Sequence, residues 1–478
     1  MNLQQDLDRH VSANADDHIT RLQQLVQQPS VSVEHFGTAD CAVLIRKWMQ
    51  RIGFEKTALF HETDNPTIYG EYRSPTSRHQ KTILLYASYD SNPVDNERWT
   101  EPPFEGRIVE RGALGRCMIG RGVNNKAKVA GILCAIESLQ SVLGNLPLNI
   151  ITVFDGEEEM FSPSLPAFVS NYESQLKQAD SLYMPFASQN SSGLARVQLG
   201  YKGVLYVELE ASGRLSGKGP AEYEIHSMHR PAVHNPIWRL LYALRTMTSD
   251  NGDQVIIQGF HDDVNPVDKE FERLLRKLAE NFDVDDYKKS LRVGTLIGNE
   301  TEAQSLLRRL FCTSQINIDG ISGGYTGVGA EAVIPTHAVA KLDIRLVPGQ
   351  KSEKILQLLR KHLDANGYPD IQVHKLAGVE SCRSGLEAPV AQALVRTYDK
   401  MGVRFQVWPT SLATIPISVF SSAPLKLPFV TGCVGYGGQS HGPDEYFVLN
   451  GNGRVEGFVG LEKCIASVLL EFGRNDPR

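Results

Sequence analysis

The chain has 478 residues, of which 41% are hydrophobic and 22% are charged, and its formal net charge is −6 at pH 7. This length is more than one compact core usually holds, so we expect a globular protein of two or three domains. The acidic balance argues against a nucleic-acid partner, because a surface that binds phosphates needs a basic face.

The N-terminus and the cysteines indicate the compartment. Residues 1–17 are polar and acidic and lack the apolar segment of an export signal. No apolar run approaches the roughly 18 residues that a transmembrane helix needs. The seven cysteines are odd in number, scattered and without a CxxC pair, which favours reduced thiols over disulfides or a thiolate metal site. We therefore expect a cytoplasmic protein that has no membrane partner.

The first part of the chain reads as an α/β domain. Helical periodicity over residues 5–27 and 40–52 predicts two helices. Apolar, β-branched runs at 83–87 and 148–159 predict strands, with a helix over 126–143 between them. This strand–helix–strand order predicts a doubly wound, mainly parallel sheet.

Polar residues follow both predicted strands. Ser88 and Asp90 come directly after the first strand, and Glu157-Glu158-Glu159 end the second run. In doubly wound sheets, sites gather at the C-terminal ends of the strands. These side chains are therefore the first candidates for a functional site.

The pattern changes near residue 212. Residues 203–213 alternate like a half-buried strand, and from about 222 to 380 alternating strands and two helices (235–248 and 352–366) indicate a small α+β insert. The α/β pattern resumes with a helix over 388–400. We predict that residues 1–212 and 382–478 form one α/β domain, with 213–381 inserted into it.

Seven motifs in order carry a resemblance to a known family: ASYDSNPV (87–94), RWTEPPFEGRI (98–108), IGRGVNNKAKVAGILCAIESL (119–139), FDGEEEMFSPSL (154–165), EIHSMHRPAVHNPIWRLLYAL (224–244), AKLDIRLVPGQ (340–350) and SHGPDEY (440–446). They run nearly end to end. The chain resembles the carnosine dipeptidase, aminoacylase and succinyl-diaminopimelate desuccinylase family of di-zinc metallopeptidases, nearest to the carnosine-dipeptidase branch. The resemblance implies a catalytic α/β domain with an inserted lid that dimerises, and hence a homodimer.

The resemblance also assigns site residues. It places the general base at Glu158 and metal ligands at Glu159 and His441, and it makes Asp90 a carboxylate that orients a ligand. Other ligand positions have changed. Ser88 stands in place of the first histidine.

Two further ligand positions lack an acid. The bridging aspartate falls on Asn124 or Asn125, and alignment of the lysine that follows favours Asn124. The last aspartate falls near Phe186. Three of the five direct metal ligands are thus lost.

Charge arithmetic limits the metal chemistry. Two dications ~3.5 Å apart repel each other by about 19 kcal/mol at an effective dielectric constant of about 20, and a neutral asparagine cannot offset that repulsion. We therefore expect no dinuclear centre and no cofactor. The alternative is a single zinc or manganese ion on Glu159 and His441, which supply two ligands where catalytic zinc usually has three.

Several side chains have two readings. Ser88 is either a nucleophile activated by His441 or a small residue that fills the space an imidazole would take. The resemblance assigns His226 to the substrate carbonyl, although it could be a lid-core residue. Arg345 matches an arginine that binds a substrate carboxylate, or forms a strand-edge salt bridge. Lys126 either brings a positive charge toward the old metal position or is solvated.

These observations predict an enzyme that acts, without a di-zinc centre, on the acyl or amide group of a small amino-acid-derived or peptide substrate. Acyl transfer, amide formation or cyclisation, and hydrolysis of an activated bond all fit. The catalytic candidates are Glu158, Asp90, Glu159 and His441, and the substrate-binding candidates are His226, Arg345, Asn235, Ser88, Asn124 and Thr414. The alternatives are a dipeptidase or N-acyl-amino-acid amidohydrolase with one metal ion, and a non-catalytic binding homologue.

Overall fold

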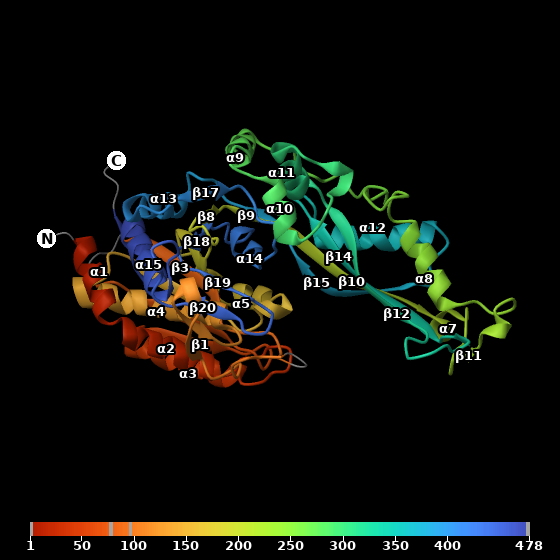
Figure 1. The fold of residues 1–478 in the computed structure, drawn as a ribbon, viewed down its shortest axis with the longest axis horizontal. Coiled ribbons are helices and arrows are strands. Elements are labelled where there is room, and N and C mark those ends of the chain that lie inside the picture. Colours follow the sequence, from red (N-terminus) through yellow and green to blue (C-terminus); the bar gives the residue numbers. More distant parts are fainter. Residues whose placement is uncertain (1–2, 76–79, 95–97, 475–478) are drawn as a thin grey trace. The chain divides into compact units, whose positions relative to one another are not determined.

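A computed structural model describes residues 3–75, 80–94 and 98–474 (Figure 1). Contacts within the chain separate two compact units. Unit 1 comprises Met1–Gly200, Arg383–Pro409 and Val419–Arg478, and unit 2 comprises Tyr201–Cys382 and Thr410–Ser418. The predicted boundary at residue 212 differs from this division, because strand β10 (Gly203–Ser212) pairs along its length with strands of unit 2.

The core of unit 1 is a sheet of eight strands in the order β1-β2-β6-β3-β7-β18-β8-β17. Strand β3 lies between β6 and β7 and is parallel to both, and β18 continues the parallel run beyond β7. The predicted α/β class with a mainly parallel sheet is confirmed. The strands are β1 (Lys56–Phe60), β2 (Thr67–Tyr72), β3 (Thr82–Ser88), β6 (Asn149–Asp155), β7 (Ser181–Ala187), β8 (Ala195–Gln198), β17 (Phe405–Trp408) and β18 (Phe429–Cys433).

The parallel strands form because they are apolar throughout. All seven residues of β3 are buried, as expected for a strand with neighbours on both sides and helices over both faces. The helices of unit 1 are α1 (Leu3–Ala13), α2 (Ala15–Gln27), α3 (Thr38–Arg51), α4 (Val123–Leu143), α5 (Leu165–Asn171), α6 (Glu173–Leu176), α13 (Pro389–Met401), α14 (Ser418–Ser421) and α15 (Phe458–Gly473). Helix α4 packs against β3 on one side and against α2 and α15 on the others.

A second, smaller sheet in unit 1 has the strand order β19-β20-β5-β4. Its strands are β4 (Arg107–Glu110), β5 (Arg116–Ile119), β19 (Gly437–Gly438) and β20 (Tyr446–Val448). The loop between β19 and β20 carries His441, and β5 leads through Gly122 into α4. Gly122 has a positive φ of 74°, and a Cβ there would lie 2.8 Å from the Cβ of Ser91, so this turn requires glycine.

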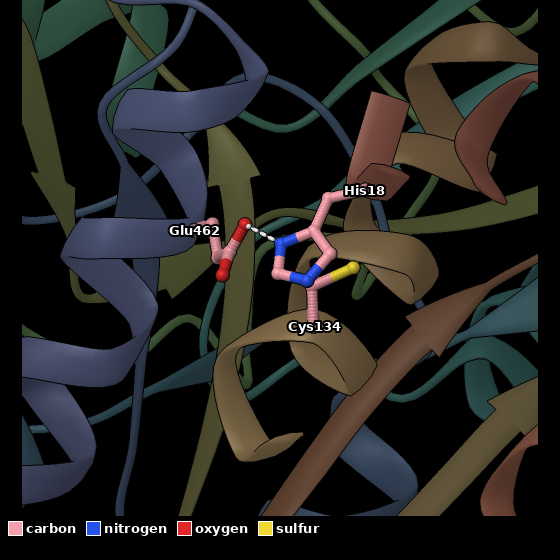
Figure 2. A group of neighbouring side chains, drawn as sticks. All are labelled: His18, Cys134 and Glu462. Carbon is pink, nitrogen blue, oxygen red and sulfur yellow. Dashed lines mark hydrogen bonds and ion pairs between the residues drawn. The ribbon is translucent and has the colours of Figure 1, made fainter. Parts of the chain in front are cut away.

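Three buried side chains join the helices of unit 1 (Figure 2). His18 of α2 lies with its Nδ1 2.8 Å from Oε2 of Glu462 in α15, and the hydroxyl of Ser138 in α4 donates to Oε1 of Glu462 at 2.8 Å. Cys134, also in α4, completes the group. Among the described residues this is the one cluster whose His, Cys and Glu ligand atoms all lie within 4.8 Å of one another. The direct contact between His18 and Glu462 makes it a hydrogen-bonded network rather than a cradle around an ion.

The core of unit 2 is an antiparallel sheet in the order β12-β14-β10-β15. Its strands are β10, β12 (Gln315–Gly323), β14 (His337–Leu346) and β15 (Gln372–Val379), and β11 (Ile225–His226) pairs separately with β13 (Val333–Ile334). Short strands β9 (Gly200–Tyr201) and β16 (Cys382–Arg383) pair where the chain passes between the units.

Unit 2 contains more helices than the two predicted. Helices α8 (Pro236–Arg245) and α12 (Ser352–Ala365) correspond to the predicted pair and pack on the sheet. The others are α7 (Gly213–Ser216), α9 (Lys269–Ala279), α10 (Val284–Leu291) and α11 (Ala303–Cys312). They were missed although their start signals are present: Asp268 and Asp283 cap α9 and α10 through side-chain hydrogen bonds to backbone N–H groups.

The expectations about the cysteines and about membrane-spanning helices can be compared with the structure. All seven cysteines fall in the described residues, and each is a free thiol. Within residues 3–75, 80–94 and 98–474, no helix combines the length and the apolar character needed to cross a membrane.

Candidate active site

The ends of two adjacent parallel strands bring the first candidate residues together. In the register of β3 with β6, Ser88 stands opposite Asp155, so the segments that follow each strand leave the sheet side by side. Asp90 follows β3, and Glu158 and Glu159 follow β6. The backbone N–H of Glu159 donates to Oδ2 of Asp90 at 3.0 Å, which ties the two segments. The sequence pattern also places Ser88, Asp90 and the acidic triplet after the ends of these two strands.

Asp90 is a fully buried carboxyl group. Its Oδ1 has no hydrogen-bond partner in the described structure. Burial raises the pKa of Asp90 well above its usual range, and the negative charge of Glu159 adds to this effect. The carboxyl group therefore lies where a positively charged or hydrogen-donating neighbour would stabilise its ionised form.

Glu159 has both carboxylate oxygens occupied. The side-chain amide of Asn92 donates to Oε2 at 2.9 Å, and the amide of Asn125 donates to Oε1 at 2.9 Å. His441 approaches the same Oε2, with its Nε2 at 3.4 Å. The Glu159 side chain is 8% exposed, whereas the His441 side chain is 65% exposed. Glu159 is thus fixed from the protein side, and the imidazole faces solvent.

The two asparagines at the start of α4 have different environments. Asn124 donates from its side-chain amide to Oε1 of Glu445 at 2.9 Å. Asn125 donates to Glu159 and also to the backbone carbonyl of Asp90 at 3.0 Å. The structure therefore places Asn125 against Asp90 and Glu159, whereas the favoured Asn124 contacts Glu445.

A lysine that sequence reasoning passed over lies beside Ser88. Lys128, on the second turn of α4, donates from Nζ to Oγ of Ser88 at 3.1 Å, and both residues are buried. Burial lowers the pKa of Lys128, while the negative charges of Glu158, Glu159 and Asp90 act in the opposite direction. Lys126, which had been considered for this place, instead donates to the backbone carbonyl of Gln28 at 2.6 Å.

The spacing of residues along the predicted helix could have located Lys128. Residues three apart on a helix share a face, so the side chain of Lys128 lies on the same face of α4 as that of Asn125. The Lys128 ammonium, which lies beside Ser88, and the Asn125 amide, which contacts Glu159, thus come from the same helix.

Glu158 is the titratable group of the cluster that is best placed for proton transfer. Burial raises its pKa to about 7, with a further increase from the charge of Glu159 and an opposing decrease from Lys128. A carboxyl group with a pKa near neutrality can accept or donate a proton at working pH. The neighbouring Glu157 is structural, because its Oε2 accepts from the backbone N–H of Ser164 at 3.0 Å and Thr63 donates to its other oxygen.

The donor set does not fit a pair of divalent ions. Ser88 offers a hydroxyl already bonded to an ammonium, Asn125 directs amide hydrogens at Glu159, and β7 carries no acid around Phe186. A divalent ion about 4 Å from the Lys128 ammonium would be repelled by about 8 kcal/mol at an effective dielectric constant of about 20. The family resemblance implies a pair of zinc ions, and this set of donors does not fit such a pair.

The remaining predicted substrate residues belong to unit 2. Arg345 of β14 donates from Nε and Nη2 to Oδ2 of Asp343 at 3.0 and 2.9 Å, and from Nη1 to Oγ1 of Thr414 at 3.1 Å. Two of the predicted residues, Arg345 and Thr414, are therefore in direct contact. The salt bridge, which was the alternative reading of Arg345, is present.

The other two have local structural contacts. His226 is exposed at the end of β11, and its Nδ1 accepts the backbone N–H of Met228 at 3.1 Å. Asn235 caps α8, because its side-chain oxygen accepts the backbone N–H of Ile237 at 2.8 Å.

The capping role of Asn235 gives a stability prediction. Replacing Asn235 by alanine removes the cap and is expected to lower the free energy of unfolding of unit 2 by about 1 kcal/mol. Asn235→Asp keeps a capping oxygen and should lose no more than a few tenths of that amount. Urea unfolding followed by circular dichroism measures both variants. Equal stability of the alanine variant and the parent protein would refute the cap.

The motifs, the parallel sheet and the carboxylate cluster together define a metallopeptidase-type α/β protein. Residues 211–371 match the model of a peptidase dimerisation domain of the M20 type. The chain is 29% identical to an M20 family metallo-carboxypeptidase from Sulfolobus solfataricus, with a TM-score of 0.84 over 95% of this chain and 99% of that one. The chain belongs to the M20 metallopeptidase family.

Two curated relatives are dipeptidases. The chain is 25% identical to the Cys-Gly metallodipeptidase of Schizosaccharomyces pombe over 369 residues, which cover 74% of each chain. It is 24% identical to the human Beta-Ala-His dipeptidase over 307 residues, which cover 63% of this chain and 56% of the relative. The predicted family is thereby confirmed.

Proposed function

We propose that this protein is an enzyme that acts, without a bound metal ion, on the acyl or amide group of a small amino-acid-derived or peptide substrate. The proposal depends mainly on Glu159, which the resemblance makes a metal ligand. Both of its carboxylate oxygens accept hydrogen bonds from side-chain amides, one from Asn92 and one from Asn125, each at 2.9 Å. Each oxygen thus accepts one amide hydrogen, which takes part of the lone-pair density that a carboxylate would otherwise offer to a metal ion. The carboxylate cluster is thus present, and the position of the metal ligand is held by protein donors.

Glu158 transfers the proton in this proposal. Asp90, Glu159 and His441 support it by fixing the segment after β6 and by contributing charge. Without metal, a bound water keeps its high pKa, so water is a poor nucleophile for an ordinary peptide bond. Acyl transfer and amide formation or cyclisation suit this site better. In these reactions an amine attacks the acyl carbon of an ester or thioester, the C–N bond forms as the C–O or C–S bond breaks, and the proton that the amine loses passes through Glu158 to the departing alcohol or thiol. Hydrolysis of an activated acyl bond also fits.

The substrate side of the proposal rests on unit 2. Arg345 and His226 would bind the carboxylate and the carbonyl oxygen of a substrate, and Thr414 holds the Arg345 guanidinium through its 3.1 Å hydrogen bond. The match of residues 211–371 to a dimerisation domain supports a homodimer. The free thiols fit a reducing compartment, for which we propose the cytoplasm.

Removal of divalent metal tests the proposal. We expect turnover to be unchanged after dialysis against a chelator, because no step uses a metal ion. Mass spectrometry would follow the products from Cys-Gly and β-Ala-His, the dipeptides named for the relatives, and from acyl esters and thioesters offered with amine acceptors. The S. pombe metallodipeptidase, assayed alongside, provides the metal-dependent control.

A hydrolase with one metal ion is the second candidate. The 3.4 Å approach of His441 to Glu159 favours it, because these two side chains are the neighbouring ligands that such an ion would use. Activity abolished by the chelator and restored by zinc or manganese would select this candidate and reject metal independence.

A further inference from the structure

The charge balance of the carboxylate cluster leads to one inference beyond its proposed chemistry. Three carboxyl groups, those of Asp90, Glu158 and Glu159, follow the ends of β3 and β6. Asp90 is fully buried, and the Glu159 side chain is 8% exposed. Carboxylates gathered in this way need a cation, or must take up protons. Lys128 of α4 reaches the end of β3, where its Nζ lies 3.1 Å from Oγ of Ser88.

We propose that the Lys128 ammonium is the resident cation of this site: from its place beside Ser88 it supplies the positive charge that a divalent metal ion would otherwise bring to the carboxylates, and it keeps such ions out. The inference rests on the proposed function and extends it by naming the group that replaces the metal. Lys128 is held by Ser88, whose Oγ accepts from Nζ at 3.1 Å, so serine and lysine act as a matched pair at this position.

The identity of Ser88 fits this role. A histidine at the end of β3 would place an imidazole where the ammonium now sits, whereas a serine is small and offers an oxygen acceptor. The hydroxyl is fully buried, so it is reached by Lys128 and not by solvent. An ammonium has three N–H donors, and Ser88 accepts one of them.

Lys126 provides the matched control. It lies two residues earlier on α4 and is also buried, but it donates to the carbonyl of Gln28 and has no contact with Ser88. The substitution Lys126→Met removes a buried ammonium from the same helix but leaves the Lys128 ammonium beside Ser88. The two lysines therefore separate a general effect of lost charge from an effect at the carboxylate cluster.

The test is a titration of the full-length protein with Zn²⁺ and Mn²⁺, followed by calorimetry and by thermal unfolding. The chelator-treated parent and Lys126→Met are expected to show no saturable binding that depends on Glu159. Lys128→Met is expected to bind one ion at least about tenfold more tightly than the parent, and to unfold at a higher temperature when the ion is present. Adding Glu159→Gln to Lys128→Met should abolish that binding.

The outcomes separate this inference from the proposed function. Equal, Glu159-dependent binding of one ion by the parent and by Lys128→Met would overturn the inference. Absence of binding in both, with Lys128→Met folded, would overturn the inference alone and leave metal independence standing. If Lys128→Met does not fold, crystals of the parent protein soaked in millimolar Mn²⁺ decide the question: an anomalous peak beside Ser88 overturns the inference, and an ammonium there with no peak supports it.

Discussion

Replacing Glu158 by glutamine is expected to lower kcat by about 10²- to 10⁴-fold on any substrate that the parent enzyme turns over. A glutamine amide keeps the shape of the side chain but neither takes up nor releases a proton, and general acid–base catalysis contributes a factor of this size. Single-turnover kinetics with the most active substrate of the panel measures the effect. Glu173→Gln, which changes an exposed carboxylate of α6, is the matched control and should retain parental kcat.

The pH dependence of kcat/KM tells which way the proton moves. Because burial and the charge of Glu159 raise the pKa of Glu158 to about 7, the profile should change near neutrality. If Glu158 is the base, its ionised form is active and kcat/KM rises as the pH passes through about 7. If it is the acid, kcat/KM falls over the same range. A profile flat from about pH 5 to about pH 9 would contradict both roles, and full activity of Glu158→Gln, with a tightly bound ligand, would select a non-catalytic binding protein.

Replacing His18 by alanine is expected to lower the free energy of unfolding by about 3–5 kcal/mol. The change leaves the buried Glu462 carboxylate without its 2.8 Å imidazole partner, and breaking a buried pair by removing one member carries a penalty of this size. Urea or thermal unfolding of the full chain provides the measurement. His10→Ala, on the neighbouring helix α1, removes a partly exposed imidazole and should change stability by less than about 1 kcal/mol.

A double variant separates loss of the pair from loss of packing. His18→Leu combined with Glu462→Leu removes both polar partners and fills the space with apolar groups, so it should recover much of the stability that His18→Ala loses. A double variant no more stable than His18→Ala would show that the network is held by shape rather than by charge. A loss below about 1 kcal/mol in His18→Ala would contradict the pairing itself.

The sequence located the strand ends of unit 1 because apolar strands leave an unambiguous pattern. The run that contains β3 has no polar interruption, so Ser88 and Asp90 could be placed at its C-terminal end before any coordinates. The acidic triplet after β6 followed in the same way. Local alternation likewise indicated β10 and β14 of unit 2.

The start of α4 could not be fixed in the same way. The segment before it is one residue shorter than the family pattern, and a shift of one residue turns a helix face by about 100°. Whether Asn124 or Asn125 faces the carboxylates therefore depended on where the helix begins, which is set by the left-handed turn at Gly122. Lys128 went unnoticed for the same reason, since its face follows from that of Asn125.

Other errors had detectable signals. The capping residues Asp268 and Asp283 precede α9 and α10. Within α9, Phe271, Leu274 and Leu275 repeat at helical spacing and are buried. The strand-edge salt bridge that was the alternative for Arg345 is made with Asp343, as expected for residues two apart on a strand, which point to the same face.

The strand order of unit 1 also bears on how the nascent chain folds. Strand β18 lies between β7 and β8, yet residues 429–433 are translated long after both neighbours. Until they leave the ribosome, β7 and β8 each expose an unpaired edge, and such edges promote association with other chains. This sheet is therefore completed only when residues 429–433 have emerged, and a nascent chain that lacks them exposes the two edges.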